Sequence, residues 1–356
     1  MKISENIPIS SLTTMRLGGP ARYVIEIENP SEIKSAYDFA KSKNLPTFVL
    51  GGGANTIGHD EGFNGVIIKS AIKSIKSRRV TVAERDHHGV YDMGEDSNRQ
   101  DPPYLITAMS GEEWDNVVAY ACERGLTGIE ALSKIPGLTG AAPVQNIGAY
   151  GQEIAGVFVE AEVYDTKDGQ IKTLQKPDLH FSYRHSILNT TETNRYFVIS
   201  ITLELKPGIM ARPFYNSIEK YIAAHNITDF TPSSIRDIVS KIRSDKLPDP
   251  KEKASSGSFF KNIYLTDTEA TEAEAKGYPV YHGHDGLKIN SGWLIEQAGL
   301  AGQLIHGMRV NEKAALVLIN ESAKNYSDLA AARTEIVNTI KNKFGYTLEQ
   351  EPVEIA

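Results

Sequence analysis

The segment Ile135–Gly151 (IPGLTGAAPVQNIGAYG) constrains the fold more than any other part of the chain. It is rich in glycine, proline and alanine and has no charged side chain, whereas a surface linker of this length is normally polar. Its glycines permit positive φ angles and close approach of the backbone to another body. The segment therefore favours a backbone pressed against a large flat ligand, with N–H groups available for phosphate oxygens. The alternative is a tightly turned loop inside the core.

The bulk composition is that of a globular protein with two or three domains, since the chain has 356 residues and is 40% hydrophobic. Its net charge of −7, without a basic stripe, argues against nucleic-acid binding. The single cysteine, Cys122, excludes an intramolecular disulfide and falls on the apolar side of a predicted helix, where we expect it to be buried. No signal peptide or transmembrane run is present, so we expect a cytoplasmic protein without membrane contact.

Residues 22–70 have a strand–helix–strand pattern. Arg22–Glu28 alternates like a strand, Ser31 can cap the following helix, and the strand Thr47–Leu50 runs into the glycine loop Gly51–Thr56 (GGGANT).

This glycine loop does not fit a Rossmann dinucleotide site. That site requires a helix directly after the glycines, and Thr56 occupies the position of its third glycine. Because the chain continues as a loop and then a strand, we predict a phosphate cradle of backbone N–H groups of a non-Rossmann kind.

Several other elements follow from periodicity. Ser110 and Glu113 form a capping-box pattern that predicts a helix ended by Gly125, with one apolar face. We also predict a hairpin at Asp168-Gly169 and a helix C-cap at Gly345. The remaining predictions are strands over Val157–Tyr164, Ile171–Leu174, Phe197–Leu205 and Tyr346–Ile355, helices over Ser234–Arg243 and Asp328–Phe344, and a domain boundary at Lys246–Pro250.

Histidines give no convincing metal site. His87-His88 lies in residues 84–103, a polar and aperiodic stretch that we interpret as a solvated excursion. His282 and His284 lack a third ligand, and a turn explains them better.

Three residue types could carry chemistry. Arg184 offers a fixed cation for a carboxylate or phosphate, although a lone arginine more often forms a surface salt bridge. Ser258, in an apolar glycine-serine turn, could donate a proton, but no histidine accompanies it as in a triad. Glu349 and Glu351 alternate on the last predicted strand, where glutamates ordinarily face water. The residues alone indicate a multidomain α+β protein that binds a phosphate-bearing ligand.

The ordered motifs resemble the UDP-N-acetylenolpyruvoylglucosamine reductase family, in particular its first type, and run from Thr13 almost to the end of the chain. They are Thr13–Gly19 (TTMRLGG), Leu50–Asn55 (LGGGAN), Gly137–Gly151, Tyr183–Ser186 (YRHS), Lys246–Pro250 (KLPDP), Gly257–Asn262 (GSFFKN), Gly292–Gly299 (GWLIEQAG) and Ala315–Asn320 (ALVLIN).

The resemblance implies an α+β fold: a vanillyl-alcohol-oxidase-type FAD-binding pair of subdomains and a separate α+β substrate-binding domain. Its implied boundaries are 1–70 for the first FAD-binding subdomain, 71–247 with 345–356 for the second, and 248–344 for the substrate domain.

The resemblance also implies the reaction. NADPH reduces non-covalently bound FAD, which then reduces the enolpyruvyl ether of UDP-N-acetylenolpyruvoylglucosamine to UDP-N-acetylmuramate for peptidoglycan. Negative charge builds on the substrate carboxylate, where Arg184 and its partner Glu351 would stabilise it, and Ser258 would protonate the α-carbon.

Further residues are carried over by motif position. The resemblance implies FAD contacts at Gly51, Gly52, Gly53, Ala54, Asn55, Thr56, Pro136, Gly137, Gly140, Ala141, Asn146, Gly148 and Ala149. It implies substrate contacts at Tyr150, Tyr183, Tyr215, Lys246, Asn262 and Gln297, and no metal.

The chain departs from the family pattern at three places. Ala54 stands where serine is frequent, residues 84–103 lengthen a connection, and Leu348–Pro352 reads LEQEP in place of LEPE. The last departure leaves open whether Glu349 or Glu351 faces the flavin.

Two other functions remain possible at this point. One is an FAD-dependent oxidase of the same fold that acts on an alcohol or hydroxy acid, and the other is a nucleotide-binding module without catalysis. The intact set of Arg184, Ser258 and Glu351 argues against the second. For the reductase we expect a monomer.

Overall fold

The computed structural model describes residues 1–81, 102–283 and 286–356, so the 84–103 excursion, with His87-His88, and His284 fall wholly or largely outside the described residues. Contacts divide the described chain into two units. The first contains Met1, Glu26–Tyr37 and Lys69–Arg243, and the second contains Lys2–Ile25, Asp38–Ile68 and Ser244–Ala356. Among the described helices, none combines the length and apolarity needed for a transmembrane span.

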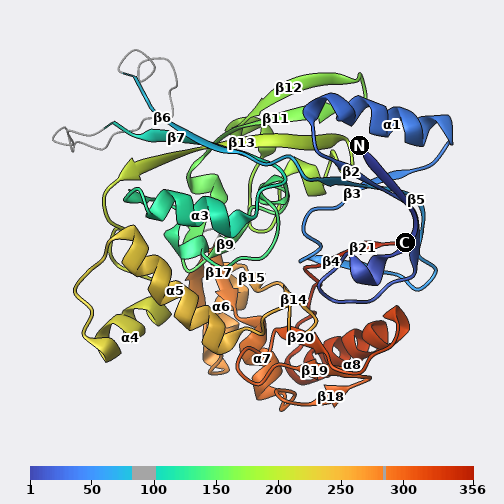
Figure 1. The fold of residues 1–356 in the computed structure, drawn as a ribbon. Coiled ribbons are helices and arrows are strands. Elements are labelled where there is room, and N and C mark those ends of the chain that lie inside the picture. Colours follow the sequence, from blue (N-terminus) through green and yellow to red (C-terminus); the bar gives the residue numbers. More distant parts are fainter. Residues whose placement is uncertain (82–101, 284–285) are drawn as a thin grey trace. The chain divides into compact units, whose positions relative to one another are not determined.

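The first unit is built on an antiparallel sheet with the order β12-β11-β13-β7-β6 (Figure 1). The hairpin predicted at Asp168-Gly169 is confirmed: β11 and β12 pair with Tyr164 opposite Ile171. The strands are β6 (Ile75–Arg79), β7 (Tyr104–Met109), β8 (Leu126–Thr127, paired with β13), β11 (Phe158–Asp165), β12 (Gln170–Gln175) and β13 (Tyr196–Pro207).

Helix α3 (Trp114–Cys122) packs on this sheet through the predicted face. Its buried residues join one core cluster with Ile106, Ala161 and Ile201 of the strands. The predicted capping box is wrong, because Glu113 is the N-cap and makes no side-chain bond. The N–H of Trp114 instead donates to the carbonyl of Gly137 at 3.0 Å. The backbone of the glycine-rich loop thus takes the place of the cap.

Two helices complete the first unit. α4 (Asn216–His225) and α5 (Pro232–Lys246) share an apolar cluster. α5 is longer than the predicted helix over Ser234–Arg243, since Pro232 fits the first helical turn, and α4 was not predicted.

The N-terminal part of the second unit holds a sheet ordered β1-β2-β5-β3. Its strands are β1 (Lys2–Pro8), β2 (Pro20–Ile27), β3 (Thr47–Val49) and β5 (Phe63–Ser70). The last two residues of β2 and of β5 are assigned to the first unit. α1 (Ile33–Ser42) follows a 3₁₀ turn capped by Asn29 with Glu32, so the predicted Ser31 cap is wrong. The loop Gly51–Thr56 leads into β4 (Thr56–Gly58), a strand as predicted.

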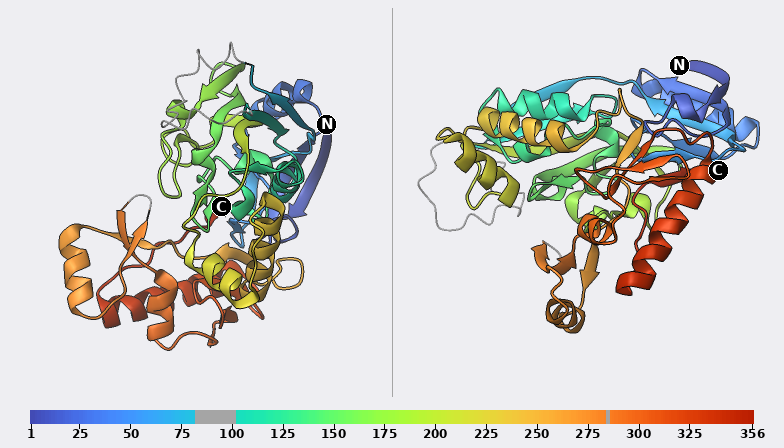
Figure 2. Two further views of the ribbon diagram at one scale, coloured as in Figure 1. Left: turned by 90° about the vertical axis from the view of Figure 1, so that its left-hand side faces the viewer. Right: turned by 90° about the horizontal axis from the view of Figure 1, so that it is seen from below.

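The C-terminal part of the second unit, coloured orange to red in Figure 2, contains two sheets. Their strand orders are β14-β20-β19-β18 and β15-β17-β16. Their strands are β14 (Ser255–Ser258), β15 (Ile263–Leu265), β16 (Tyr281–Gly283), β17 (Gly286–Ile289), β18 (Leu304–Ile305), β19 (Met308–Val310) and β20 (Val317–Asn320). The helices are α6 (Asp267–Ala275), α7 (Ser291–Gln297) and α8 (Tyr326–Phe344). Gly345 ends α8 with φ 83°, which confirms the predicted C-cap.

The last strand is shorter than predicted. β21 covers only Val353–Ile355 and pairs in parallel with β4, with Val353 opposite Thr56. The segment 345–356, which the domain prediction placed with 71–247, therefore ends beside the strand that follows the glycine loop.

Candidate active site

The loop Gly51–Thr56 forms a backbone cradle in the second unit. Among the described residues, no acceptor receives a hydrogen bond from the N–H groups of Gly51, Gly52, Gly53 or Ala54. The Gly53 carbonyl, in contrast, is held by the backbone N–H of Thr14 at 3.0 Å. Four successive available N–H groups suit phosphate oxygens, as in a nest.

Gly53 is required by this geometry. Its φ is +67°, and a Cβ there would lie 2.1 Å from the carbonyl oxygen of Leu12. The neighbouring Thr13 hydroxyl is buried and has no hydrogen-bond partner within the described part of the chain. An orphaned donor beside available N–H groups fits a phosphate-bearing cofactor such as FAD. Sequence reasoning included Thr13 in a motif but gave it no role.

In the loop Ile135–Gly151, which belongs to the first unit, seven backbone N–H groups donate to backbone carbonyls. The N–H groups of Thr139 and Gly140 donate to the carbonyls of Glu112 and Ser110, and those of Ala141, Ala142, Val144, Asn146 and Ile147 donate within the loop. These seven N–H groups are therefore not available to a ligand. For the rest of the loop the expectation of available N–H groups stays a prediction.

Two glycines of this loop are explained by close packing. A Cβ at Gly140 would lie 2.5 Å from the Ser110 Cβ, and one at Gly148 would lie 2.8 Å from the Glu153 Cγ. Pro136 precedes Gly137 and Ala141 follows Gly140. Gly148-Ala149 forms β9, which pairs with β10 (Gln152–Glu153).

The side-chain amide of Asn146 is bonded within the protein and is not available to a ligand. Its Nδ2 donates to the Glu153 carboxylate at 3.0 Å and to the Ser182 carbonyl at 3.2 Å, and its Oδ1 accepts from the Ala155 N–H at 3.1 Å. Any cofactor contact at Asn146 would therefore come from its backbone.

Arg184 approaches the same loop. Its guanidinium donates to the Gly148 carbonyl at 3.2 Å and lies 5.0 Å from the centre of the Tyr183 ring. Arg184 has φ +59°, an uncommon conformation for a side chain of this size. The local fold therefore brings the Arg184 guanidinium to the loop at Gly148.

Tyr150 and Tyr215 come together in the first unit. Tyr150 has φ +48°, and the two ring centres lie 5.7 Å apart in an edge-to-face arrangement. Burial raises the pKa of the Tyr150 hydroxyl, and the positive charge of Arg243 on α5 opposes that rise. Sequence reasoning placed Arg243 only at the end of a helix and gave it no role.

In the second unit, Ser258 lies at the end of β14. It is half-buried and faces Val317 of β20 across the ladder, and Gly257 before it has φ +72°. The structure describes no hydrogen bond made by the Ser258 hydroxyl. The hydroxyl is therefore available to a ligand.

The two glutamates near the C-terminus have different environments. Glu349 is 71% exposed and pairs with the Lys261 ammonium at 2.5 Å. Glu351 is half-buried, and its N–H donates to the carbonyl of Phe259, the residue after Ser258, at 2.9 Å. The Asn55 amide also donates to the Glu351 carbonyl at 3.4 Å. Glu351 thus joins the glycine loop and the Ser258 strand, which favours it over Glu349.

A polar clasp holds β21 in this position. Glu354 accepts hydrogen bonds from Arg333 at 2.6 Å and Tyr326 at 2.9 Å, and it contacts His59 at 2.8 Å. Burial opposes ionisation of Glu354, but these hydrogen bonds and one from Gln350 outweigh it and lower the pKa of Glu354 to about 2. The clasp comprises His59, Tyr326, Arg333, Gln350 and Glu354.

The expected polar substrate contacts in the second unit are spread out. Asn262 accepts from the N–H of Ser291 at 3.2 Å, at the start of α7, and Gln297 ends that helix. The two ends of α7 are about 10 Å apart, so Asn262 and Gln297 lie at opposite ends of this helix. Lys246 is exposed at the end of α5. This spacing suits a ligand with several polar groups rather than a single anion.

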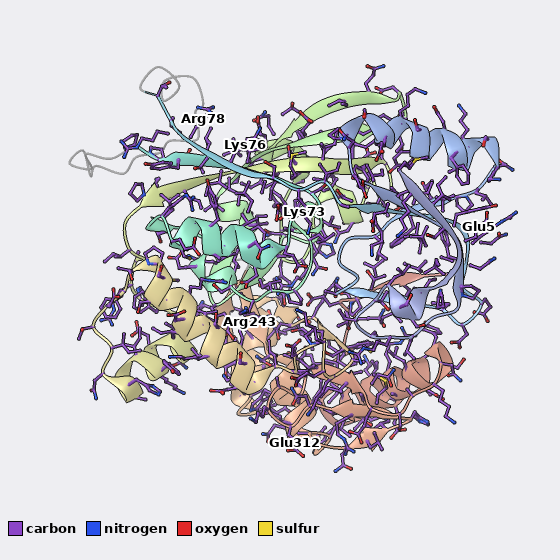
Figure 3. The ribbon with its side chains drawn as sticks, viewed as in Figure 1. Glu5, Lys73, Lys76, Arg78, Arg243 and Glu312 are labelled. Carbon is purple, nitrogen blue, oxygen red and sulfur yellow. The ribbon has the colours of Figure 1, made fainter. Side chains whose placement is uncertain are left out.

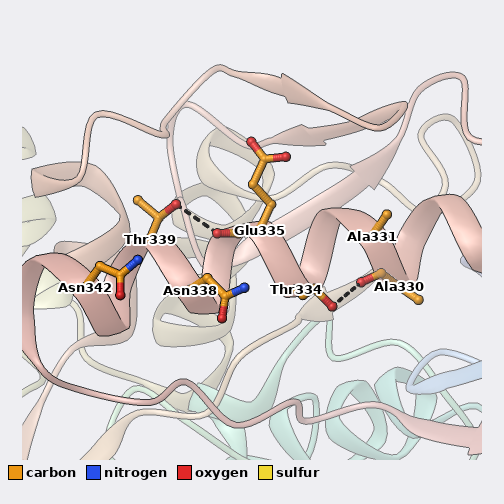
Figure 4. Close-up of a pocket in the computed structure, with 7 residues that line it drawn as sticks. All are labelled: Ala330, Ala331, Thr334, Glu335, Asn338, Thr339 and Asn342. Carbon is orange, nitrogen blue, oxygen red and sulfur yellow. Dashed lines mark hydrogen bonds between the residues drawn. The ribbon is translucent and has the colours of Figure 1, made fainter.

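A shallow depression on the exposed side of α8 does not coincide with these residues (Figure 4). Its lining comes from that helix alone, and Glu335 is its one ionisable group. The lining residues are Ala330, Ala331, Thr334, Glu335, Asn338, Thr339 and Asn342. Lacking a cation, it does not suit a diphosphate.

Other candidate chemistry is not supported. Within the described residues there is no cluster of His, Cys, Asp and Glu side chains that could hold a metal ion. Cys122 is buried as predicted, and burial raises the pKa of its thiol to about 12, so it is a poor nucleophile.

Family models match two parts of the chain. Residues 249–355 match the C-terminal domain of UDP-N-acetylenolpyruvoylglucosamine reductase, and residues 95–175 match an FAD binding domain.

Similar proteins cover nearly the whole chain. A UDP-N-acetylenolpyruvoylglucosamine reductase of Ralstonia nicotianae is 33% identical over 99% of both chains, and one of Burkholderia multivorans is 32% identical over 97% of this chain and 95% of its own. The crystal structure of such a reductase from Thermus caldophilus covers 100% of both chains with a TM-score of 0.65 and 22% identity. A VAO-type flavoprotein from Myceliophthora thermophila covers 95% of this chain and 73% of its own, with a TM-score of 0.51 and 11% identity. Both structures confirm the predicted fold class.

Proposed function

The chain belongs to the UDP-N-acetylenolpyruvoylglucosamine reductase family, and from this premise we propose that it reduces UDP-N-acetylenolpyruvoylglucosamine to UDP-N-acetylmuramate in peptidoglycan synthesis. The proposed cofactor is non-covalent FAD and the co-substrate is NADPH. FAD, when bound, would take hydride from NADPH and give it to the β-carbon of the enolpyruvyl ether.

The observation that carries the proposal is the available N–H row of Gly51–Ala54 in a chain of this family. These donors, with the orphaned Thr13 hydroxyl, would bind the FAD diphosphate. Asn55 and Thr56 would position the loop, since Asn55 accepts from the Val353 N–H at 3.0 Å and Thr56 pairs with β21.

The substrate carboxylate gains charge when hydride adds to the neighbouring double bond. Arg184 would stabilise that charge, because its guanidinium is held in place by the Gly148 carbonyl and the Tyr183 ring. Glu351 would assist in its protonated form or as the partner of Arg184.

Ser258 would then donate its hydroxyl proton to the α-carbon and regain a proton from solvent. Its half-buried position, without a hydrogen bond described for its hydroxyl, supports this role. Tyr150, Tyr183, Tyr215, Lys246, Asn262 and Gln297 would bind the remaining polar and aromatic groups of the substrate.

We also propose that residues 1–70 and 71–247 with 345–356 hold FAD, and that residues 248–344 hold the substrate. We propose that the protein is a monomer. We also propose that it acts in the cytoplasm, because both co-substrates are polyanions that do not cross a bilayer unaided. Sedimentation at micromolar concentration tests the monomer.

The decisive experiment is a flavin absorption spectrum of the purified protein, followed by titration with NADPH and then with UDP-N-acetylenolpyruvoylglucosamine. We expect a yellow protein that NADPH bleaches and the enolpyruvyl substrate restores. Colourless protein that cannot take up FAD would contradict the proposal. Flavin that stays attached after denaturation would favour a covalent-flavin oxidase of the same fold instead.

A further inference from the structure

Residues 350–353, which include Glu351, lie outside a regular ladder. Gln350 forms an isolated bridge, and β21 begins only afterwards. The Glu351 N–H donates to the Phe259 carbonyl at 2.9 Å, and the Glu351 carbonyl accepts from the Asn55 amide at 3.4 Å. The position of Glu351 therefore depends on individual contacts and not on a continuous sheet.

Arg333 reaches this stretch from α8. Its Nη1 atom donates to Oε1 of Gln350 and to Oε1 of Glu354, both at 2.6 Å. The helix is fixed by its opposite face, whose residues Leu329, Ala332, Ile336 and Ile340 are buried in the core of the second unit. Arg333 is therefore a firmly placed cation that holds side chains on both sides of Glu351.

Gln350 passes this contact on to the backbone. Its Nε2 atom donates to the Pro352 carbonyl at 2.8 Å and to the Glu354 carboxylate at 3.1 Å. A guanidinium can only donate, so Arg333 fixes the Gln350 oxygen as the acceptor and leaves the Gln350 NH₂ group to bind Pro352. The residues before and after Glu351 are thereby tied to each other.

We propose that Arg333 is a positioning residue for Glu351. By fixing the Gln350 amide, it holds the backbone on either side of Glu351 and so the carboxyl group of Glu351. This inference rests on the proposed function, in which Glu351 acts when the enolpyruvyl substrate reoxidises the flavin. Arg333 acts through Glu351 and does not itself contact the substrate.

The test is Arg333→Met, followed in both half-reactions by stopped-flow absorption at saturating FAD. We expect reoxidation by the enolpyruvyl substrate to slow about ten- to a hundredfold, since a misplacement of about 1 Å can cost about a hundredfold. Flavin reduction by NADPH should change less than about twofold. Arg333→Lys should recover part of the reoxidation rate, because an ammonium can donate to both Gln350 and Glu354.

The matched control is Arg309→Met. Arg309 of β19 binds Glu321 through two hydrogen bonds of 2.7 and 2.6 Å. It also donates to the Gly302 carbonyl at 2.8 Å, next to Glu312, which is labelled in Figure 3. This substitution removes a comparable ion pair from the same unit, and both half-reactions should stay within about twofold of the wild type.

Two further measurements distinguish positioning from a merely structural role. In the double variant Arg333→Met, Glu351→Gln, the losses in reoxidation rate should not add, because Arg333 acts only through Glu351. Hydrogen–deuterium exchange of the FAD-loaded protein needs no turnover. Exchange at residues 349–353 should be faster in Arg333→Met than in the wild type, with the protection of α8 retained.

A second variant covers the case in which Arg333→Met does not fold. Gln350→Met removes the amide between Arg333 and the Pro352 carbonyl but keeps the ion pair of Arg333 with Glu354. It should slow reoxidation about tenfold and leave flavin reduction unchanged.

The results also separate this inference from the proposed function. If the wild-type flavin is reduced and reoxidised but Gln350→Met and Arg333→Met reoxidise at the wild-type rate, or lose both half-reactions equally, the role of Arg333 is overturned and the reductase remains. Additive losses in the double variant would overturn it as well. If NADPH and the enolpyruvyl substrate do not reduce and reoxidise the wild-type flavin, the proposed function itself is wrong.

Discussion

At the scale of single residues, the proposed role of Ser258 can be tested by comparison with the other serines of β14. Ser255 and Ser256 are buried with hydroxyls that have no partner, whereas Ser258 is half-buried. We expect Ser258→Ala to leave flavin reduction by NADPH intact but to slow reoxidation by the enolpyruvyl substrate about 10²- to 10⁴-fold, the range for a lost general acid. Stopped-flow measurement of the two half-reactions checks this.

The control for this prediction is Ser256→Ala. It removes a hydroxyl that makes no hydrogen bond in the described structure, so both half-reactions should keep their wild-type rates. Equal losses in both half-reactions for Ser258→Ala would refute a proton-donor role.

The two C-terminal glutamates also give a test at this scale. Glu351→Gln should slow flavin reoxidation strongly, because its backbone bonds to Phe259 and Asn55 hold Glu351 close in the fold to the residue after Ser258, and the substitution removes the carboxyl group proposed to act there. Glu349→Gln should have little effect, since its exposed carboxylate pairs with Lys261. Rapid-mixing kinetics of both variants decide the question. A larger loss for Glu349→Gln would reverse the assignment.

At the scale of elements, the glycine loop depends on the space around Gly53. Gly53→Ala should lower FAD affinity and thermal stability, because the added Cβ meets the Leu12 carbonyl oxygen at 2.1 Å. The control is Gly125→Ala. Gly125 has the same φ of +67°, but nothing lies within 4 Å of its added Cβ. It should therefore cost only the conformational strain, about 1 kcal/mol, and retain FAD. The flavin content of the purified variants measures the difference.

The clasp that holds β21 predicts a pH dependence of stability. The pKa of Glu354 falls from an ordinary 4.5 to about 2 in the folded chain, so its ionised form stabilises the fold above pH 4.5. This stabilisation is lost as the pH falls toward 2. Glu354→Gln should reduce the free energy of unfolding at pH 7 by about 2–3 kcal/mol. Urea unfolding should show the difference from wild type shrinking between pH 4.5 and 2. A constant difference would contradict the role of ionised Glu354.

Sequence periodicity predicted elements better than it predicted how they end. The hairpin β11–β12 and the buried face of α3 were predicted from local patterns. The caps of α1 and α3 were not: a 3₁₀ turn capped by Asn29 with Glu32 precedes α1. At α3 the distant Gly137 carbonyl, and not a local side chain, accepts the first N–H.

At the scale of the whole molecule, bound FAD should stabilise the fold by mass action. At a free FAD concentration one hundred times Kd, the free energy of unfolding should rise by about 2.7 kcal/mol. Thermal unfolding followed by circular dichroism should show this as a higher Tm. Riboflavin is the matched control, because it has the isoalloxazine ring but no diphosphate for Gly51–Ala54. Equal stabilisation by both ligands would show that these N–H groups do not bind the diphosphate.

The family and fold class could be predicted from the ordered motifs, since they span almost the entire chain. The geometry of the site could not. Which N–H groups of the loop Ile135–Gly151 remain available depends on contacts such as those of the Thr139 N–H with the Glu112 carbonyl and of the Gly140 N–H with the Ser110 carbonyl, between residues far apart in sequence.

The pairing of β21 with β4 determines when, during synthesis of the chain, the surroundings of the glycine loop are completed. The residues of β4, Thr56–Gly58, meet their partners Val353–Ile355 only after the intervening chain has been synthesised. At roughly 5–20 residues per second, about 300 residues take about 15–60 s. During that interval the nascent chain carries the glycine loop without its neighbouring strand. The cradle is therefore completed late in synthesis. We expect its ligand to bind only when the polypeptide is nearly complete.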